Sequence, residues 1–264
     1  MPARSIRSPA VAGLFYPADP HELGAEVDAL LAAAAPAAGP PPKAVVAPHA
    51  GYVYSGPVAA SAFRPLEKLR GQIRRVVLLG PSHYVGFDGL AAPASDAFRT
   101  PLGVIEVDRA ALAALADLPQ VLTSDRAHQR EHSLEVELPF LQRALGDFTL
   151  VPLVVGDATP AEVAEVLERL WGGEETLVVV STDLSHYLDA AAATRRDGAT
   201  SRAVLELAPE RIGADDACGR NPLRGLLVAA RAHALVPRLL DQRHSGDTAG
   251  PNDRVVGYGA YAFA

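Results

Sequence analysis

Histidine residues follow short apolar segments at three separate places in the sequence. His49, His83 and His186 each come within six residues of the end of a run of valine, leucine and alanine, and Asp183 follows the same run as His186. Imidazole nitrogens are good ligands for iron, copper, zinc and nickel, and the imidazole pKa lies near neutrality, so these residues suit metal binding and proton transfer. One such histidine would mean little, but three segments that end in the same way indicate a common site.

Three apolar runs must position these residues. They cover residues 44–47, 76–79 and 177–180, and none alternates apolar with polar side chains, so each predicts a strand that is covered on both faces. Two further strands are predicted at residues 150–155 and 254–258. In open α/β sheets, ligands bind beyond the carboxyl ends of the strands. If the three runs are parallel neighbours, the histidines and the aspartate therefore project into one crevice.

Helical patterns lie between the predicted strands. A proline follows a capping residue at Asp19-Pro20 and at Thr159-Pro160, and Asn221-Pro222 has the same form. Alternating strands and helices predict an α/β fold, with a mixed and mainly parallel sheet flanked by helices. The proline-rich stretch at residues 40–42 comes too early to separate two domains. We therefore expect a single α/β domain over residues 1–264.

Cys218 and Asp183 are the candidates for a third metal ligand. Cys218 lies just before the predicted helix start at Asn221-Pro222, where the positive end of a helix lowers the pKa of a thiol. A lone cysteine is also commonly a small buried apolar residue without reactivity. The turn-forming residues around Cys218, Gly219 among them, favour the ligand interpretation.

A second polar cluster surrounds Glu131 and His132. His128 and His132 are four residues apart, which on a helix would place both on one face. For His128 we favour an exposed, charged helix start. His132 and Glu131 are candidates to face the crevice as substrate contacts, and Tyr54 either lines the same pocket or packs in the core. The sequence Ser55-Gly56-Pro57 is typical of a helix cap and start.

Composition excludes several classes of protein. The 264 residues include 24 basic and 31 acidic side chains, and the formal net charge of −7 gives no reason to expect a nucleic-acid or anionic-membrane partner. A single cysteine excludes an intramolecular disulfide and a zinc site with several cysteines, and it suits the reducing cytoplasm. The alanine-rich run at residues 29–38 is far shorter than the ~20 residues of a membrane span. We expect a cytoplasmic protein.

Five segments carry a family resemblance. They are His49-Ala50-Gly51-Tyr52-x-Tyr54-Ser55-Gly56, Leu79-Gly80-Pro81-Ser82-His83, Glu131-His132-Ser133-Leu134-Glu135, Asp183-Leu184-Ser185-His186-Tyr187 and Cys218-Gly219. Together and in this order they resemble the Memo family, whose prokaryotic members are called AmmeMemoRadiSam system protein B. The likeness begins near Arg7 and ends near Tyr258, so it covers nearly the whole chain.

The resemblance implies a fold similar to that of the LigB-type, class III extradiol dioxygenases. Those enzymes open catechol rings with non-haem Fe(II), which is held by two histidines and a glutamate. By this likeness His49 and His83 match the two metal histidines, and Cys218 stands where the carboxylate ligand would be. His186 matches the acid/base position, with Asp183 beside it.

The resemblance also implies ligands and partners. Animal members of the family are described as copper- or iron-binding and as phosphotyrosine-peptide binders. Prokaryotic members are associated with an AMMECR-type protein and a radical SAM protein, so these two are the expected partners. A small molecule or a peptide is the expected ligand of the crevice.

The departure from the dioxygenase pattern leaves the function open. A soft thiolate in place of a carboxylate favours copper(I), zinc or a more covalent iron site, and it places an oxidisable sulfur beside any bound O₂. The first hypothesis is an oxidoreductase that depends on Fe(II) or copper, with His132, Glu131 and Tyr54 on the pocket wall. The second is a non-catalytic module that binds a peptide, a small molecule or a metal. A zinc hydrolase is the third.

Overall fold

The computed structural model describes residues 4–36 and 39–264, and two sheets organise them. The strands of the large sheet are β2 (Ala44–Ala47), β3 (Arg75–Pro81), β4 (Leu90–Ala92), β7 (Val121–Thr123), β8 (Thr149–Val155), β9 (Thr176–Ser181), β10 (His186–Leu188), β11 (Pro237–His244) and β12 (Val255–Phe263). Their order is β10-β12-β2-β9-β3-β8-β4-β7, and β11 also pairs with β12. A small sheet has the order β1-β5-β6, from β1 (Ile6–Arg7), β5 (Ala97–Thr100) and β6 (Gly103–Glu106).

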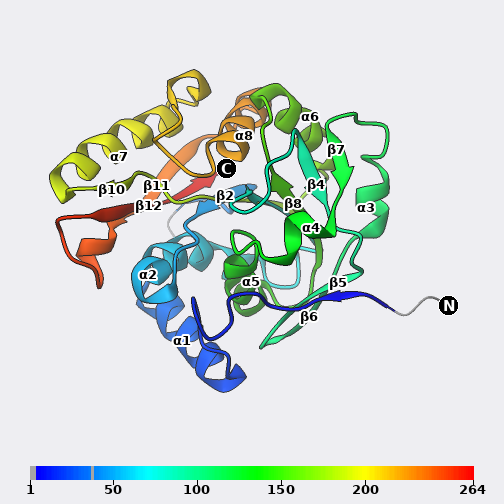
Figure 1. Ribbon diagram of the computed structural model, residues 1–264, viewed down its shortest axis with the longest axis horizontal. Helices are drawn as coiled ribbons and strands as arrows, with labels where there is room; N and C mark the ends of the chain where they lie inside the picture. The colour runs from blue at the N-terminus through cyan, green and yellow to red at the C-terminus, as the bar shows by residue number, and fades with distance from the viewer. Residues whose placement is uncertain (1–3, 37–38) are drawn as a thin grey trace.

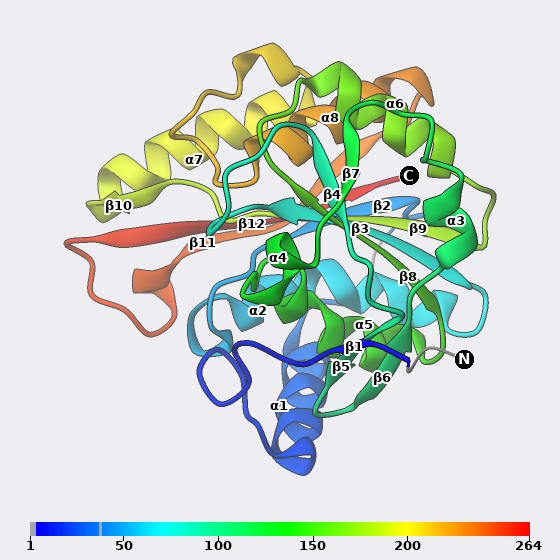
Figure 2. The same ribbon diagram turned by 45° about the vertical axis from the view of Figure 1, so that its right-hand side comes forward.

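Helices cover both faces of the large sheet (Figures 1 and 2). One layer holds α1 (Pro20–Ala33), α2 (Tyr52–Phe63) and α5 (Leu138–Leu145), and the other holds α6 (Pro160–Leu170), α7 (Ala190–Leu205) and α8 (Arg220–Ala232). Short helices lie in the connections: η1 (Arg64–Leu69), α3 (Arg109–Ala113), α4 (Asp125–Gln129), η2 (Glu135–Glu137), η3 (Pro209–Arg211) and η4 (Ser245–Asp247). This arrangement confirms the predicted α/β class with a mixed sheet flanked by helices.

The centre of the large sheet is parallel. Strands β2, β9, β3 and β8 pair in parallel register, whereas β12 and β4 run antiparallel to their neighbours β2 and β8. Every residue of β2 and β9 is buried. Val45 and Val179 pack into one apolar core, and Val46 and Val178 pack into the other. The runs lack alternation because each face of the sheet is covered, as the sequence predicts.

The predicted helix starts at Asp19 and Thr159 are confirmed. The Asp19 carboxylate accepts hydrogen bonds from the backbone N–H groups two and three residues further on. Thr159 and Glu162 form a reciprocal capping box at the start of α6. Helix α8 begins at Arg220, one residue before the predicted start. Among the described helices, none combines the length and the apolar character that a membrane crossing requires.

The predicted helix start at Ser55-Gly56-Pro57 is wrong. Helix α2 begins at Tyr52, so Pro57 lies inside it and removes one backbone hydrogen bond. The helix nevertheless forms there because most of its apolar residues, Tyr52, Val58 and Phe63 among them, are buried against the sheet and against α1 and α5. The Ser55 hydroxyl donates to the Ala50 carbonyl at 2.8 Å instead of capping a helix.

The expectation of an exposed His128 is also wrong. Only 2% of His128 is exposed, and its Nε2 donates to the Ala91 carbonyl at 2.9 Å. Helix α4 ends at Gln129, so His128 and His132 do not share a helix face. The ring instead packs edge-on against Phe98, in a core that the sequence spacing does not reveal.

Candidate metal centre

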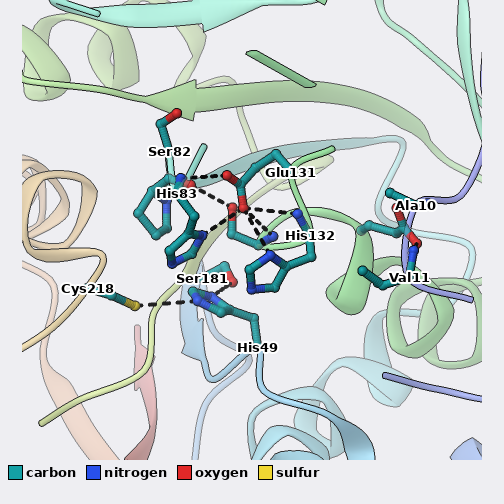
Figure 3. A network of polar contacts seen from close by, with 12 residues as sticks. Ala10, Val11, His49, Ser82, His83, Glu131, His132, Ser181 and Cys218 are labelled. Carbon is teal, nitrogen blue, oxygen red and sulfur yellow. Dashed lines mark hydrogen bonds and ion pairs between the residues drawn. The ribbon is translucent and has the colours of Figure 1, made fainter. Parts of the chain in front are cut away.

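Three imidazoles converge at the carboxyl-terminal edge of the parallel strands (Figure 3). His49 lies two residues after β2, His83 lies two residues after β3, and His132 lies three residues before η2. The ring centroids are 5.2 Å apart for His49 and His83, 5.5 Å for His49 and His132, and 4.6 Å for His83 and His132. One nitrogen from each ring lies within 4.8 Å of the other two, which is a spacing that can hold a metal ion.

Glu131 orients two of these three residues. Its carboxylate accepts hydrogen bonds from His83 Nδ1 at 2.8 Å and from the backbone N–H groups of His83, His132 and Ser133 at 2.6, 2.9 and 3.0 Å. Burial opposes ionisation, but the hydrogen bonds from His83 and Ser133 outweigh it and lower the pKa of Glu131 to about 2. Because His83 Nδ1 donates, its Nε2 is left as the free lone pair.

His49 is fixed from the opposite side. Its Nδ1 lies 2.7 Å from Ser181 Oγ, and that hydroxyl donates to Glu137 Oε1 at 2.7 Å. Its backbone N–H donates to Asp183 Oδ1 at 2.9 Å. Burial, together with the neighbouring imidazoles, lowers the pKa of His49 well below its ordinary value, so the ring is neutral. Burial raises the pKa of Glu137 well above its ordinary value, and Asp183 adds to this, although the Ser181 hydrogen bond opposes it.

His132 has a buried ring nitrogen for which the described residues offer no hydrogen-bond partner. This nitrogen is Nδ1, which lies 3.5 Å from Glu131 Oε1. Burial lowers the pKa of His132 to about 4, even though Glu131 opposes the shift. Because Nδ1 lies on the Glu131 side of a neutral ring, Nε2 can offer its lone pair to a cation. The donor set therefore fits a metal ion.

Cys218 lies beside the imidazole group but outside it. Its Sγ is 3.4 Å from His49 Nε2, and it accepts from the Asp183 backbone N–H at 3.3 Å. Burial, with the Asp183 charge, raises the pKa of Cys218 to about 12, so the side chain is a neutral thiol. The residue lines a second cavity of about 620 Å³. The structure thus brings Cys218 against one predicted ligand, while His132 groups with both predicted histidines.

A cavity of about 630 Å³ opens on the His132 side of the group. Asp183 and His186 line it, as does Tyr54 in the first turn of α2. His186 Nδ1 donates to the Leu184 carbonyl at 2.8 Å, so its Nε2 is the nitrogen available for proton transfer. Burial raises the pKa of Asp183 to about 6, although the charge of His186 opposes the shift.

Glu131 lies away from this cavity. Its side chain is only 1% exposed, and its oxygens are taken up by donors of the protein itself. The structure therefore gives Glu131 an orienting position behind the imidazoles, whereas His132 and Tyr54 lie on the cavity wall.

A buried ion pair fastens the amino-terminal segment over the site. Glu135 pairs with Arg7 at 2.6 Å, and it accepts hydrogen bonds from the backbone N–H groups of Ala10 and Val11. The Tyr16 hydroxyl donates to the same carboxylate at 2.6 Å. The segment held in this way includes Phe15, whose ring lies 4.9 Å from that of His132.

Sequence reasoning missed three residues that support the site. Ser181 contacts the His49 ring directly, and Glu137 is linked to that ring through Ser181. Glu135 anchors the segment that lies against His132. A signal for the glutamates does exist, because Glu135 and Glu137 alternate with apolar residues directly after His132. Charged side chains in such a segment are buried only when they are paired or hydrogen-bonded.

Comparison with known proteins places the chain in a family. The sequence model of the family described as Memo-like protein matches residues 7–262. The chain belongs to the Memo-like family. A MEMO1 family protein of Aquifex aeolicus is 38% identical over 96% of this chain and 97% of its own length, and one of Methanopyrus kandleri is 39% identical over 97% and 98%. A solved structure of an uncharacterized protein from Escherichia coli K12 aligns over 74% of this chain and 91% of its own, with a TM-score of 0.46 at 15% identity.

The centre of this Memo-like protein thus contains three imidazoles, of which His49 and His132 are neutral, together with one neutral thiol and two cavities. The first cavity adjoins His132 and contains the acid/base candidates His186 and Asp183, and the second adjoins Cys218. This arrangement can bind a metal ion and move a proton beside it.

Proposed function

We propose that this Memo-like protein is an oxidoreductase that depends on Fe(II) or copper and acts on an organic molecule bound in the 630 Å³ cavity. The observation that carries the proposal is the convergence of His49, His83 and His132, with one nitrogen from each ring within 4.8 Å of the others. Imidazole ligands suit iron, copper and zinc, and the adjacent Cys218 sulfur adds a soft donor that iron and copper also accept. The metal, when bound, would supply redox and Lewis-acid chemistry.

His186 is the residue proposed to move protons. Its Nδ1–H is committed to the Leu184 carbonyl, which leaves Nε2 at the cavity wall as an acceptor of one proton. Asp183 lines the same cavity, and its pKa of about 6 allows it to exchange a proton near neutral pH. These two residues would accept a proton from the bound molecule and return it.

The cavity wall suits an apolar or aromatic molecule. Tyrosines contribute much of it, namely Tyr16, Tyr52, Tyr54, Tyr187 and Tyr258. Their rings provide a large apolar contact area and exclude water from the bound molecule. The Arg254 guanidinium, which also lines the cavity, lies 4.6 Å from the centre of the Tyr187 ring.

The test is an anaerobic purification, elemental analysis and an assay of oxygen uptake. We expect iron or copper at about one ion per chain, and oxygen consumption with at least one member of a panel of catechols, coupled to loss of that catechol. His83→Ala should lose the metal and keep the fold, because the side chain is 28% exposed. His21→Ala, at an exposed residue in the first turn of α1, is the matched control and should retain the metal.

Three outcomes would contradict the proposal. Zinc alone in the purified protein would favour a hydrolase. Bound iron or copper without oxygen consumption across the panel would favour a module that binds its ligand or the metal without turnover. Unchanged metal content in His83→Ala would remove the imidazole group as the metal site.

A further inference from the structure

A buried chain of two hydrogen bonds joins His49 to Glu137. It runs from His49 Nδ1 to Ser181 Oγ and from Ser181 Oγ to Glu137 Oε1, and each contact is 2.7 Å long. His49 is 1% exposed, and Ser181 and Glu137 are fully buried. The three residues come from the loop after β2, the end of β9 and η2, so tertiary packing alone brings them together.

The two hydrogen bonds must run in the same direction because a serine hydroxyl carries a single proton. When Ser181 donates that proton to the Glu137 carboxylate, its oxygen can only accept from His49. The ring proton of His49 then lies on Nδ1, and Nε2 is a free lone pair. Nε2 is also the nitrogen that faces Cys218, at 3.4 Å.

We infer that Glu137 is a positioning residue that acts through Ser181 to hold the ring proton of His49 on Nδ1, so that Nε2 is free to bind a metal ion. The inference rests on the metal centre proposed above and deepens it. It adds a second orienting carboxylate, since Glu131 performs the equivalent task on His83 by direct contact.

If both hydrogen bonds ran in the opposite direction, His49 Nε2 would carry the ring proton and could not bind a metal ion. Without an acceptor at Glu137, the Ser181 hydroxyl would donate to His49 Nδ1, and the ring proton would lie on Nε2. A Glu137 carboxyl that donated its own proton to Ser181 would have the same effect. A protonated Nε2 offers no lone pair, so His49 could not act as a ligand until that proton was moved.

The presence of a buried glutamate at position 137 is not explained by a contribution to the stability of the fold. Its Oε2 is buried and has no hydrogen-bond partner among the described residues, and Asp183 adds unfavourable negative charge nearby. A buried carboxyl group costs free energy, and an apolar side chain of similar size at such a position is often neutral or stabilising. Glu137→Leu should therefore fold, which makes the inference testable.

The experiment compares His49 in the metal-free protein by ¹⁵N NMR, which distinguishes the two ring tautomers. Because burial raises the pKa of Glu137, spectra are recorded over a series of increasing alkaline pH, and wild type should show the Nδ1–H tautomer once the Glu137 carboxylate has formed. Glu137→Leu should show the Nε2–H tautomer. In Ser181→Ala, which removes the link between the two residues, the wild-type preference should be lost. Ser201→Ala, a buried hydroxyl on α7 away from the site, is the control and should match wild type.

Zn²⁺ titration gives the second readout. Glu137→Leu and Ser181→Ala should bind Zn²⁺ about 10- to 100-fold more weakly than wild type, which is the usual effect of losing a residue that orients a ligand. An unchanged His49 tautomer in Glu137→Leu would overturn the inference, as would unchanged Zn²⁺ affinity in both variants. If wild type itself bound no metal but the tautomer changed as expected, the proposed function would fail and the role of Glu137 in setting the tautomer would stand.

Discussion

Burial keeps several imidazoles of this protein neutral. It lowers the pKa of both His128 and His132 to about 4, and that of His49 well below its ordinary value. For His49 and His132 this has a chemical use, because a neutral ring retains the lone pair that a metal ion requires. For His128 the ring is structural, and its depressed pKa affects stability alone.

The stability of the protein should fall as the pH drops below the ordinary histidine pKa. Above about pH 6.5 both the folded and unfolded states leave His128 neutral, so its full contribution is present. Between that value and the folded pKa of about 4, only the unfolded state binds the proton, and the free energy of unfolding decreases. His128 accounts for up to roughly 3 kcal/mol of this loss.

Urea unfolding at about pH 7 and about pH 4.5 measures the loss. His128→Gln, which does not titrate, should lose less stability than wild type between these two conditions. His21→Gln, an exposed residue in the first turn of α1, should lose as much as wild type. Equal losses in wild type and His128→Gln would contradict the assignment.

At the scale of elements, close contact between α6 and α8 completes one layer of the fold. A Cβ atom at Gly225 of α8 would stand 2.3 Å from Val163 Cβ of α6, closer than two carbon atoms can approach. Helix α8 begins two residues after Cys218, so the packing of this helix also positions the thiol beside His49. Gly225 therefore affects the site indirectly, because it allows α8 to pack closely against α6.

Gly225→Ala should destabilise the protein by about 1–3 kcal/mol, because the helices must separate to admit the methyl group. This steric cost exceeds the gain in helix propensity, which is at most about 1 kcal/mol. Gly198→Ala in α7 is the matched control, since only the end of the Arg202 side chain lies within 4 Å of its Cβ. The control should be neutral or stabilising, and chemical denaturation separates the two. Equal changes in stability for the two variants would show that the contact between α6 and α8 does not exclude a side chain at position 225.

At the scale of the whole molecule, one buried ion pair joins the amino-terminal segment to the residues that follow His132. Arg7 and Glu135 are 128 positions apart, and their side chains are 6% and 0% exposed. Arg7 Nε also donates to the His128 carbonyl at 2.8 Å. The pair ties the amino-terminal segment to the residues directly after His132, and that segment carries Phe15 to the His132 ring.

Arg7→Met should therefore cost about 3–5 kcal/mol, because it leaves the Glu135 charge buried without its cation. The exposed pair of Arg4 and Glu106 is the matched control, with side chains 50% and 57% exposed. Arg4→Met should cost less than about 1 kcal/mol. Unfolding of both variants by denaturant measures the difference, and similar values for the two would mean that the buried pair does not hold the segment.

The sequence by itself determined the architecture and part of the site. Apolar runs without alternation located β2, β3 and β9, and capping residues located the starts of α1 and α6. These signals are local, since each depends on residues within one turn or one strand. Parallel neighbours share an edge, so His49, His83 and Asp183 could be expected to lie together.

Only the tertiary structure decided how the site is completed. It grouped His132 with the two histidines, moved Glu131 behind them, and set Ser181 and Glu137 against His49. These contacts depend on how loops pack across the edge of the sheet, and the energetic gain of each comes from burial and hydrogen bonding with distant residues. The hydrophobic periodicity of the sequence cannot predict such contacts. It indicates which face of a helix or strand is buried, but not which distant side chains pack against that face.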